Sequence, residues 1–200
     1  MPVQEIMKFL ESVNLMEQVE MLLALHCAPL LHGLKVSNLV KLTRNQSVAL
    51  CHNIKTSGLS IWFLDCEKDE NQVLLYRKAE MEYILHQIRV QEVLHLFGYK
   101  EFHVIPVLVH LSEEMRRYKA GEREFPHELG VLLGYPIEDV LGFMENRGEN
   151  YAYCGYWKVY GNIQQAKKQF AAYNKVREMA VLQVINGSGF IRQTTTTDYH

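Results

Sequence analysis

The sequence predicts an α+β fold that is mostly helical, with a small antiparallel sheet of about three strands. Apolar residues recur at helical spacing over most of the 200 residues, beginning with the segment 3–13. Three other segments are rich in β-branched, aromatic and large apolar residues, which favours extended structure. These predicted strands are Leu59–Asp65, Gln72–Arg77 and Tyr151–Tyr160. Because only a polar stretch separates the first two, we expect them to pair as a hairpin.

The N-terminal part of the chain is predicted to be a series of helices. After the helix over residues 3–13, a second one is expected to end near His26. Pro29 suits the first turn of a new short helix, because its missing N–H would have no helical partner there. Ser37 and Ser47 are good N-cap residues, so we expect further helices to begin directly after each of them.

Helices are also predicted to follow the hairpin, with glycine or proline marking most of their ends. Their expected ranges are 78–97, 105–119, 126–134, 137–146 and 163–185. No change in composition marks a linker within the body of the chain. We therefore expect a single domain over residues 1–186 and a flexible tail over residues 187–200.

The composition is that of an ordinary globular protein and excludes several classes of function. A net charge of −2 argues against a dedicated nucleic-acid binder, because phosphate binding needs a dense basic surface. The longest apolar runs are too short to span a bilayer, and the N-terminus lacks the pattern of a signal peptide. Four widely spaced cysteines without a CxxC motif favour a reducing compartment. We expect a soluble cytoplasmic protein with no membrane or nucleic-acid partner.

Cys27 is the thiol with the most interesting setting, within the motif HCAP (His26–Pro29). If it lies at the start of the helix that we expect at Pro29, the helix dipole would favour the thiolate. His127, in the motif FPHELG, is expected in the first turn of a helix, where neutral imidazole is favoured. The pair Cys27 and His127 would then suffice for nucleophilic thiol chemistry. The alternative is a small buried cysteine at a helix junction, and a histidine that hydrogen-bonds a nearby carbonyl.

Nine histidines also raise the question of a metal site. His26, Cys27, His127 and Cys154 are ligand types that suit zinc or iron. They show no local ligand spacing apart from the adjacent His26 and Cys27, which rarely both bind one ion. The sequence therefore predicts no metal site, and it leaves any cofactor unknown.

The segment GYWKVY is a candidate ligand-binding surface, although an ordinary packed strand is the preferred interpretation. Tyr156 and Trp157 could stack on a flat ligand, and Lys158 could anchor an anionic group. The same residues also fit an ordinary half-buried strand beneath the last helix. We place the predicted site in a cleft between the sheet and the helices that begin at HCAP and FPHELG, with His26 and Glu128 as further ligand-binding residues.

Three motifs carry a resemblance to a known family: HCAP, the run FPHELGVLLGYPIEDV, and GYWKVY. Together they resemble an uncharacterised bacterial family of proteins of about this length, a domain of unknown function. The resemblance covers most of the body of the chain. It implies a stand-alone cytosolic protein from anaerobic bacteria, and it brings no catalytic residues with it.

Two functions therefore remain open. The first is a binding or accessory module without catalysis, which holds a small ligand or a partner in the predicted cleft. The second is a thiol-dependent enzyme or redox protein that uses Cys27 and His127. We prefer the first, because no catalytic motif in the sequence is specific.

Overall fold

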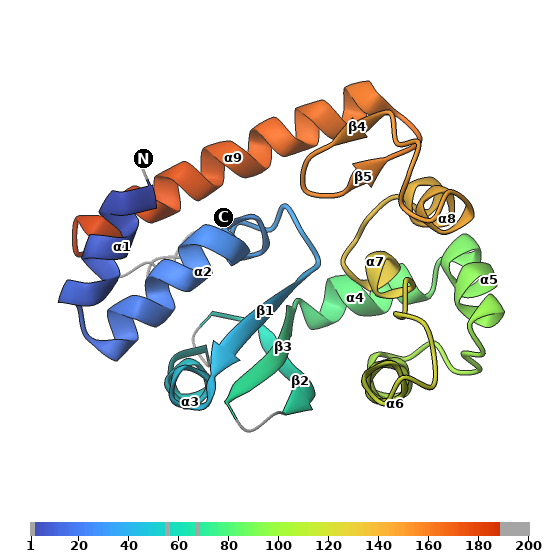
Figure 1. The fold of residues 1–200 in the computed structure, drawn as a ribbon, viewed down its shortest axis with the longest axis horizontal. Coiled ribbons are helices and arrows are strands. Elements are labelled where there is room, and N and C mark those ends of the chain that lie inside the picture. Colours follow the sequence, from blue (N-terminus) through green and yellow to red (C-terminus); the bar gives the residue numbers. More distant parts are fainter. Residues whose placement is uncertain (1–2, 55–56, 67–68, 189–200) are drawn as a thin grey trace.

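The computed structural model describes residues 3–54, 57–66 and 69–188 (Figure 1). The helices of this part of the chain are α1 (Val3–Ser12), α2 (Leu15–Leu31), α3 (Arg44–Asn53), α4 (Lys78–Leu85), α5 (Ile88–Leu96), α6 (Val104–Lys119), α7 (Leu129–Leu132), α8 (Ile137–Glu145) and α9 (Ile163–Ile185). The strands are β1 (Ser37–Thr43), β2 (Ser60–Cys66), β3 (Glu70–Tyr76), β4 (Tyr153–Cys154) and β5 (Lys158–Val159). The predicted α+β class, with helices in the majority, is confirmed.

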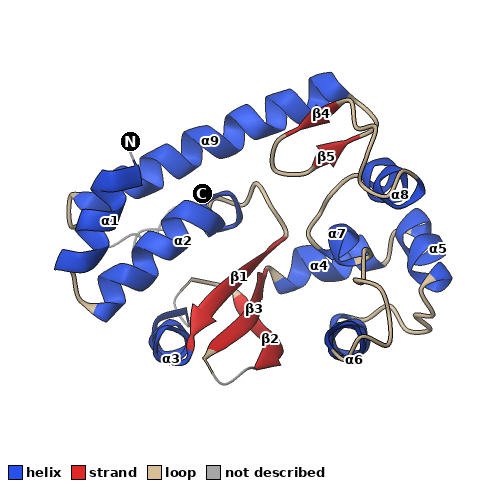
Figure 2. Cartoon of the chain, viewed as in Figure 1, coloured by secondary structure: helices blue, strands red, loops and turns tan. Residues whose placement is uncertain are grey.

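The main sheet has three antiparallel strands in the order β1-β3-β2 (Figure 2). The predicted hairpin is present as β2 and β3, with Ser60 opposite Tyr76. A register shift between Phe63 and Asp65 interrupts this pairing. The third strand of the sheet is β1, and its Ser37 also lies opposite Tyr76 across the other edge of β3.

The prediction of a helix after Ser37 is wrong, because this segment forms β1. Its side chains alternate between the two faces of the sheet, with Leu39 on one side and Val40 and Leu42 on the other. All residues of β1 pair with β3, and this pairing stabilises the extended conformation although the local sequence is compatible with a helix. The helix expected after Ser47 begins earlier, at Arg44, because the side chain of Thr43 caps it.

Four other elements also differ from the prediction. The helix predicted over residues 126–134 is reduced to α7, so His127 lies in the turn before the helix and not in its first turn. Helix α2 continues through Pro29 to Leu31, so no separate helix begins there; the proline lies near the C-terminal end of α2. The helix predicted over residues 78–97 is divided into α4 and α5. The predicted long strand Tyr151–Tyr160 contains only the two short strands β4 and β5 around a turn at Gly155. Of the predicted tail, residues 189–200 lie outside the described part of the chain.

The main sheet separates two hydrophobic cores. On β3, Val73 and Leu75 point into the first core, whereas Leu74 and Tyr76 point into the second. Helices α2 and α3 cover the first face, and α9 and α1 pack against α2. Helices α4 to α8 cover the second face (Figure 1). Burial on both faces explains why β3 has consecutive apolar residues.

A third, smaller cluster joins the β4–β5 hairpin to the N-terminal half of α9. Trp157 and Val159 from the hairpin pack against Phe170 and Tyr173 from the helix. The hairpin approaches α9 so closely at Gly155 that a Cβ atom there would lie 2.3 Å from the Phe170 ring. Only glycine fits at this position, and the close approach places Trp157 and Lys158 beside α8.

Candidate functional site

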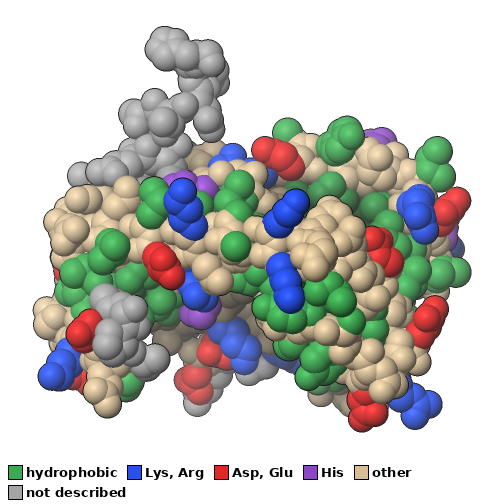
Figure 3. Space-filling view, turned by 90° about the horizontal axis from the view of Figure 1, so that it is seen from above, with side chains coloured by type: hydrophobic (Ala, Val, Ile, Leu, Met, Phe, Trp, Pro, Cys, Tyr) green, Lys and Arg blue, Asp and Glu red, His purple; other side chains and the backbone are tan. Residues whose placement is uncertain are grey.

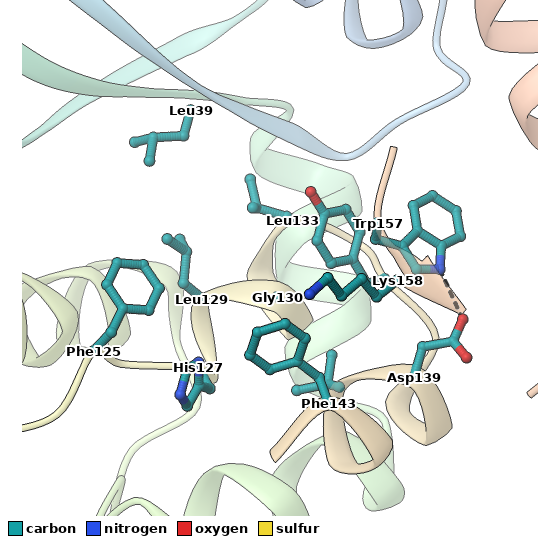
Figure 4. Close-up of a pocket in the computed structure, with 12 residues that line it drawn as sticks. Leu39, Phe125, His127, Leu129, Gly130, Leu133, Asp139, Phe143, Trp157 and Lys158 are labelled. Carbon is teal, nitrogen blue, oxygen red and sulfur yellow. Dashed lines mark hydrogen bonds between the residues drawn. The ribbon is translucent and has the colours of Figure 1, made fainter. Parts of the chain in front are cut away.

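A cavity of about 420 Å³ lies where β1, α7, α8 and the β4–β5 hairpin meet (Figure 4). Its walls are mostly aromatic and aliphatic. The aromatic rings, including one imidazole, belong to Phe125, His127, Tyr135, Phe143 and Trp157. The aliphatic wall consists of Leu39, Leu129, Leu133 and Val140, together with Gly130. The two charged side chains at the cavity are Asp139 and Lys158.

Two glycines allow α7 and α8 to form one side of this cavity. Gly134 has φ +75° and ends α7, because the left-handed conformation turns the chain toward Tyr135. Gly130 lies against α8, where a Cβ atom would be 2.9 Å from a methyl group of Val140. A larger residue at Gly130 would push the two helices apart and open the wall.

The aromatic wall is supported from behind. The ring of Tyr135 stacks on Trp157 with centroids 4.9 Å apart, and Trp157 in turn meets Phe170 of α9 edge-to-face at 4.5 Å. Lys35 lies over the Tyr135 ring at 5.3 Å and donates to the side-chain oxygen of Asn38 at 2.8 Å. Burial lowers the pKa of Lys35 to about 8. These contacts hold the aromatic rings in place around the cavity.

Asp139, in the first turn of α8, fastens the hairpin to the helix. One carboxylate oxygen accepts the indole N–H of Trp157 at 2.7 Å. The other accepts the backbone N–H groups of Tyr160 and Gly161, each also at 2.7 Å. The side chain is almost fully buried. Both of its oxygens are therefore used in structure, and Asp139 is a positioning residue for Trp157.

Lys158 supplies the cation of the cavity. Figure 4 shows its side chain extending from the hairpin toward the middle of the lining residues, above Phe143. The ammonium donates to the carbonyl of Gly148 at 2.6 Å and lies 5.6 Å from the centroid of Phe143 and 4.9 Å from that of Tyr151. Its position is thus fixed by one hydrogen bond and two ring faces.

His127 forms part of the opposite wall, between two phenylalanines. Its ring centroid lies 5.7 Å from that of Phe125 and 5.1 Å from that of Phe143. Burial lowers the pKa of His127, although the Glu124 carboxylate acts in the opposite direction. The imidazole is therefore neutral at pH 7 and offers one N–H donor and one acceptor.

Cys27 lies in a different environment from His127. It is fully buried in α2 as part of the first core, with the side-chain amide of Asn38 3.7 Å from its sulfur. Burial raises the pKa of the Cys27 thiol to about 12, although Lys35 and Asn38 act in the opposite direction. At neutral pH the group is a thiol with no open surface, which is the setting of a structural cysteine.

The other predicted site residues do not line the cavity. His26 is exposed on α2. Tyr156 points to α9, where its hydroxyl donates to the side chain of Asn174 at 3.0 Å. Of the seven residues singled out in the sequence, the structure brings three to the cavity wall: His127, Trp157 and Lys158.

Glu128 is buried next to Tyr99 of the second core. One of its oxygens accepts the Tyr99 hydroxyl at 3.3 Å, and the other has no hydrogen-bond partner among the described residues. Burial raises the pKa of Glu128. The Tyr99 ring also packs on His110, with centroids 4.0 Å apart. Glu128 is therefore a buried carboxyl group of the core, whose charge the fold disfavours.

Tyr135, Phe143 and Asp139 of the cavity wall were not predicted from the sequence as site residues. They belong to the loop after α7 and to α8, where apolar and acidic residues are explained by helix packing and the helix dipole. The only available signal was the indole of Trp157, which needs a hydrogen-bond acceptor when it is buried. An acidic residue nearby in space was the natural candidate.

The fold and the cavity define a helix-rich α+β protein with an apolar pocket beside its sheet. The chain belongs to the family described as a protein of unknown function (DUF3793), whose model matches residues 23–192. This finding agrees with the resemblance that the sequence suggested. Comparisons with curated proteins and with solved structures found no match.

Within residues 3–54, 57–66 and 69–188, no group of three or more His, Cys, Asp or Glu side chains is arranged to hold a metal ion. In the same part of the chain, none of the helices is both long and apolar enough to cross a bilayer.

Proposed function

We propose that this protein is a binding module that holds a small, largely apolar molecule in the cavity beside β1, α7 and α8. The observation that carries the proposal is the combination of size and lining. A volume of about 420 Å³ is in the range of small-molecule sites, and such sites are typically apolar with few polar groups. The described lining has this composition, with Lys158, His127 and Asp139 as its polar side chains.

The support behind the walls is a second argument for binding. Asp139 and Phe170 hold Trp157, and Trp157 holds Tyr135, so the rings are not free to collapse into the cavity. A preformed site loses little conformational entropy when a ligand enters. An apolar cavity that is kept open by its own supporting contacts is therefore suited to an apolar ligand.

The alternative of a thiol-dependent enzyme would need Cys27 to leave the first core. The thiol is fully buried, and burial raises its pKa to about 12, whereas His127 lies at the cavity wall. The observed geometry supports binding over this alternative. We also infer a cytoplasmic protein without a nucleic-acid partner. This is supported by four free cysteines and by basic side chains that are spread over the α9 face instead of gathered in one patch (Figure 3).

Calorimetry with 4-phenyl-1-butanol, a neutral molecule with an aromatic ring, tests the proposal. We expect saturable binding to the wild-type chain. Leu133→Trp should abolish it, because the larger side chain fills the cavity from its wall. Leu96→Trp is the matched control, since Leu96 is 76% exposed on α5 and does not line the cavity.

Phe143→Ala provides a second variant in case Leu133→Trp fails to fold. Removing this ring from the wall should weaken binding at least several-fold, because an aromatic contact face is lost. If Leu133→Trp and Phe143→Ala both bind the alcohol as tightly as Leu96→Trp does, the cavity is not the binding site. Absence of binding to the wild-type chain would likewise refute the proposal for ligands of this type.

A further inference from the structure

We propose that the ligand of this cavity is a monocarboxylate, an apolar body with one carboxylate group that is bound by the Lys158 ammonium, with the His127 N–H as a second donor. This inference rests on the proposed binding function and adds the chemical class of the ligand. It is carried by the position and the partners of the charged groups at the cavity.

Lys158 has hydrogen-bonding capacity left for a ligand. Its ammonium carries three N–H donors, and one of them points to the Gly148 carbonyl. Among the residues that the structure describes, no carboxylate lies within 4 Å of the Lys158 nitrogen. The two aromatic faces beside it attract the cation but do not neutralise its charge. An anion entering the cavity would supply the missing counter-charge.

Asp139, the other charged residue at the cavity, is engaged elsewhere. Its two oxygens accept three N–H groups at 2.7 Å, from Trp157, Tyr160 and Gly161. Rotating the carboxylate toward Lys158 would leave buried donors without partners, which is costly. The fold therefore keeps Asp139 as a fixed acceptor for the hairpin and leaves the ammonium available to a ligand.

His127 adds a second hydrogen-bond donor to the cavity wall. It flanks the same phenylalanine as Lys158, because the imidazole and the ammonium lie 5.1 and 5.6 Å from the centroid of Phe143. Burial lowers the pKa of His127, so the ring is neutral and adds a donor without adding a second charge. A carboxylate bound by the ammonium would place its apolar body against the remaining rings, and the imidazole N–H is a further donor on the cavity wall.

The charge balance favours a monoanion over a phosphate. One ammonium can neutralise one negative charge, whereas the second charge of a phosphate monoester would be left uncompensated beside apolar walls. A cationic ligand would face Lys158 directly and should be rejected. A neutral ligand would leave the ammonium with its present partners and gain only apolar contacts.

A matched set of ligands tests this inference by calorimetry at pH 7.5: 4-phenylbutyrate, 4-phenyl-1-butanol, 4-phenylbutylamine and 4-phenylbutylphosphonate. They share one apolar body and differ in head group. We expect the carboxylate to bind about tenfold more tightly than the alcohol, as for a hydrogen bond to a charged group, and the amine to bind most weakly. Lys158→Met should remove the advantage of the carboxylate, so that the carboxylate and the alcohol bind this variant with equal affinity.

Lys167→Met is the control for Lys158→Met, because Lys167 also lies over a hairpin tyrosine, at 5.0 Å from the ring of Tyr153, but does not line the cavity. It should leave all four affinities unchanged. Equal binding of carboxylate and alcohol, or tighter binding of the phosphonate, would overturn the inference while the binding function stands. If none of the four ligands binds, the proposed function itself fails, which is a distinguishable result.

Discussion

The two faces of the main sheet are covered in different ways, and the difference separates stability from binding. On the first face, the long helix α2 packs against the sheet and α9 packs against α2, and the fully buried residues are aliphatic or sulfur-containing. On the second face, four of the five covering helices have nine residues or fewer. That side contains buried Tyr99 and Glu128, and the cavity lies at its border with the third cluster.

Helix length gives a physical reason for this difference. Long helices present continuous apolar stripes, so α2 and the C-terminal half of α9 can close the first core. Short helices end often, and each end turns the chain and leaves backbone groups that need partners. The turns around α7 and α8 hold Tyr135 and Asp139 at the cavity. The closely packed first core thus stabilises the fold, and this stability allows the core on the second face to remain incompletely filled.

The largest expected effect concerns the thiol of the first core. Cys27 should react with iodoacetamide at least a thousandfold more slowly than the exposed Cys66 and Cys154. The rise of its pKa from 9.0 to about 12 alone reduces the thiolate fraction by that factor. Mass spectrometry after timed labelling at pH 8 measures the rates, and labelling in urea is the control. Rapid labelling of Cys27 in the native protein would revive the thiol-enzyme alternative.

The next effect compares one leucine from each side. Leu30→Ala, in the closed first core, should lower the free energy of unfolding by about 3 kcal/mol, because it creates a cavity in a packed region. Leu129→Ala should cost less, about 1–2 kcal/mol, because this side chain already borders open space. Urea denaturation measures both values. Equal losses would mean that the two sides are packed alike.

Binding provides the other half of this comparison. At a temperature where both variants are folded, Leu30→Ala should retain wild-type affinity for 4-phenyl-1-butanol. Leu129→Ala should change that affinity, because it alters the wall of the cavity. If the affinity responds to Leu30→Ala and is insensitive to Leu129→Ala, the division between the two faces is wrong.

The smallest expected effect is a change of the free energy of unfolding with pH, caused by Glu128 on the second face. Burial raises the pKa of Glu128 above its ordinary value of 4.5, so the folded state retains a proton that the unfolded chain has lost. This residue therefore makes the wild-type protein less stable as the pH rises from about 4.5 through the folded pKa. Glu128→Gln removes the titration and retains an acceptor for Tyr99.

We expect Glu128→Gln to be more stable than the wild type at pH 8, by about 1 kcal/mol for each unit of pKa shift that is removed. The difference should disappear near pH 4, where the glutamate is protonated in both states. Thermal unfolding across this range measures the effect. A constant difference between the two proteins at all pH values would show that Glu128 does not titrate as its burial implies.

The features that the sequence predicts well are those with local causes. The β2–β3 hairpin has its own apolar and aromatic residues, and α9 has a long helical period, so both were predicted near their observed bounds. In contrast, β1 is a strand because β3 lies beside it, and its sequence alone is compatible with a helix. The burial of Cys27 likewise depends on α9 and β1, which are distant along the chain.

The candidate site shows the same division. Trp157, Lys158 and His127 were found because their chemistry is unusual for a surface strand or a helix start. Tyr135 and Phe143 look like ordinary helix and loop residues, and they become wall residues only through the contact of α8 with the hairpin. No local pattern encodes that contact, so these parts of the site required the three-dimensional structure.

The most direct test of the binding claim is to locate a bound ligand by intermolecular NOEs in the complex with 4-phenylbutyrate. The ring protons of the ligand should show NOEs to Trp157 and Leu133, and the methylene group next to its carboxylate should show NOEs to Phe143 and the Lys158 side chain. NOEs to methyl groups of the first core, such as those of Leu30, or to exposed residues such as Leu96 would contradict the account.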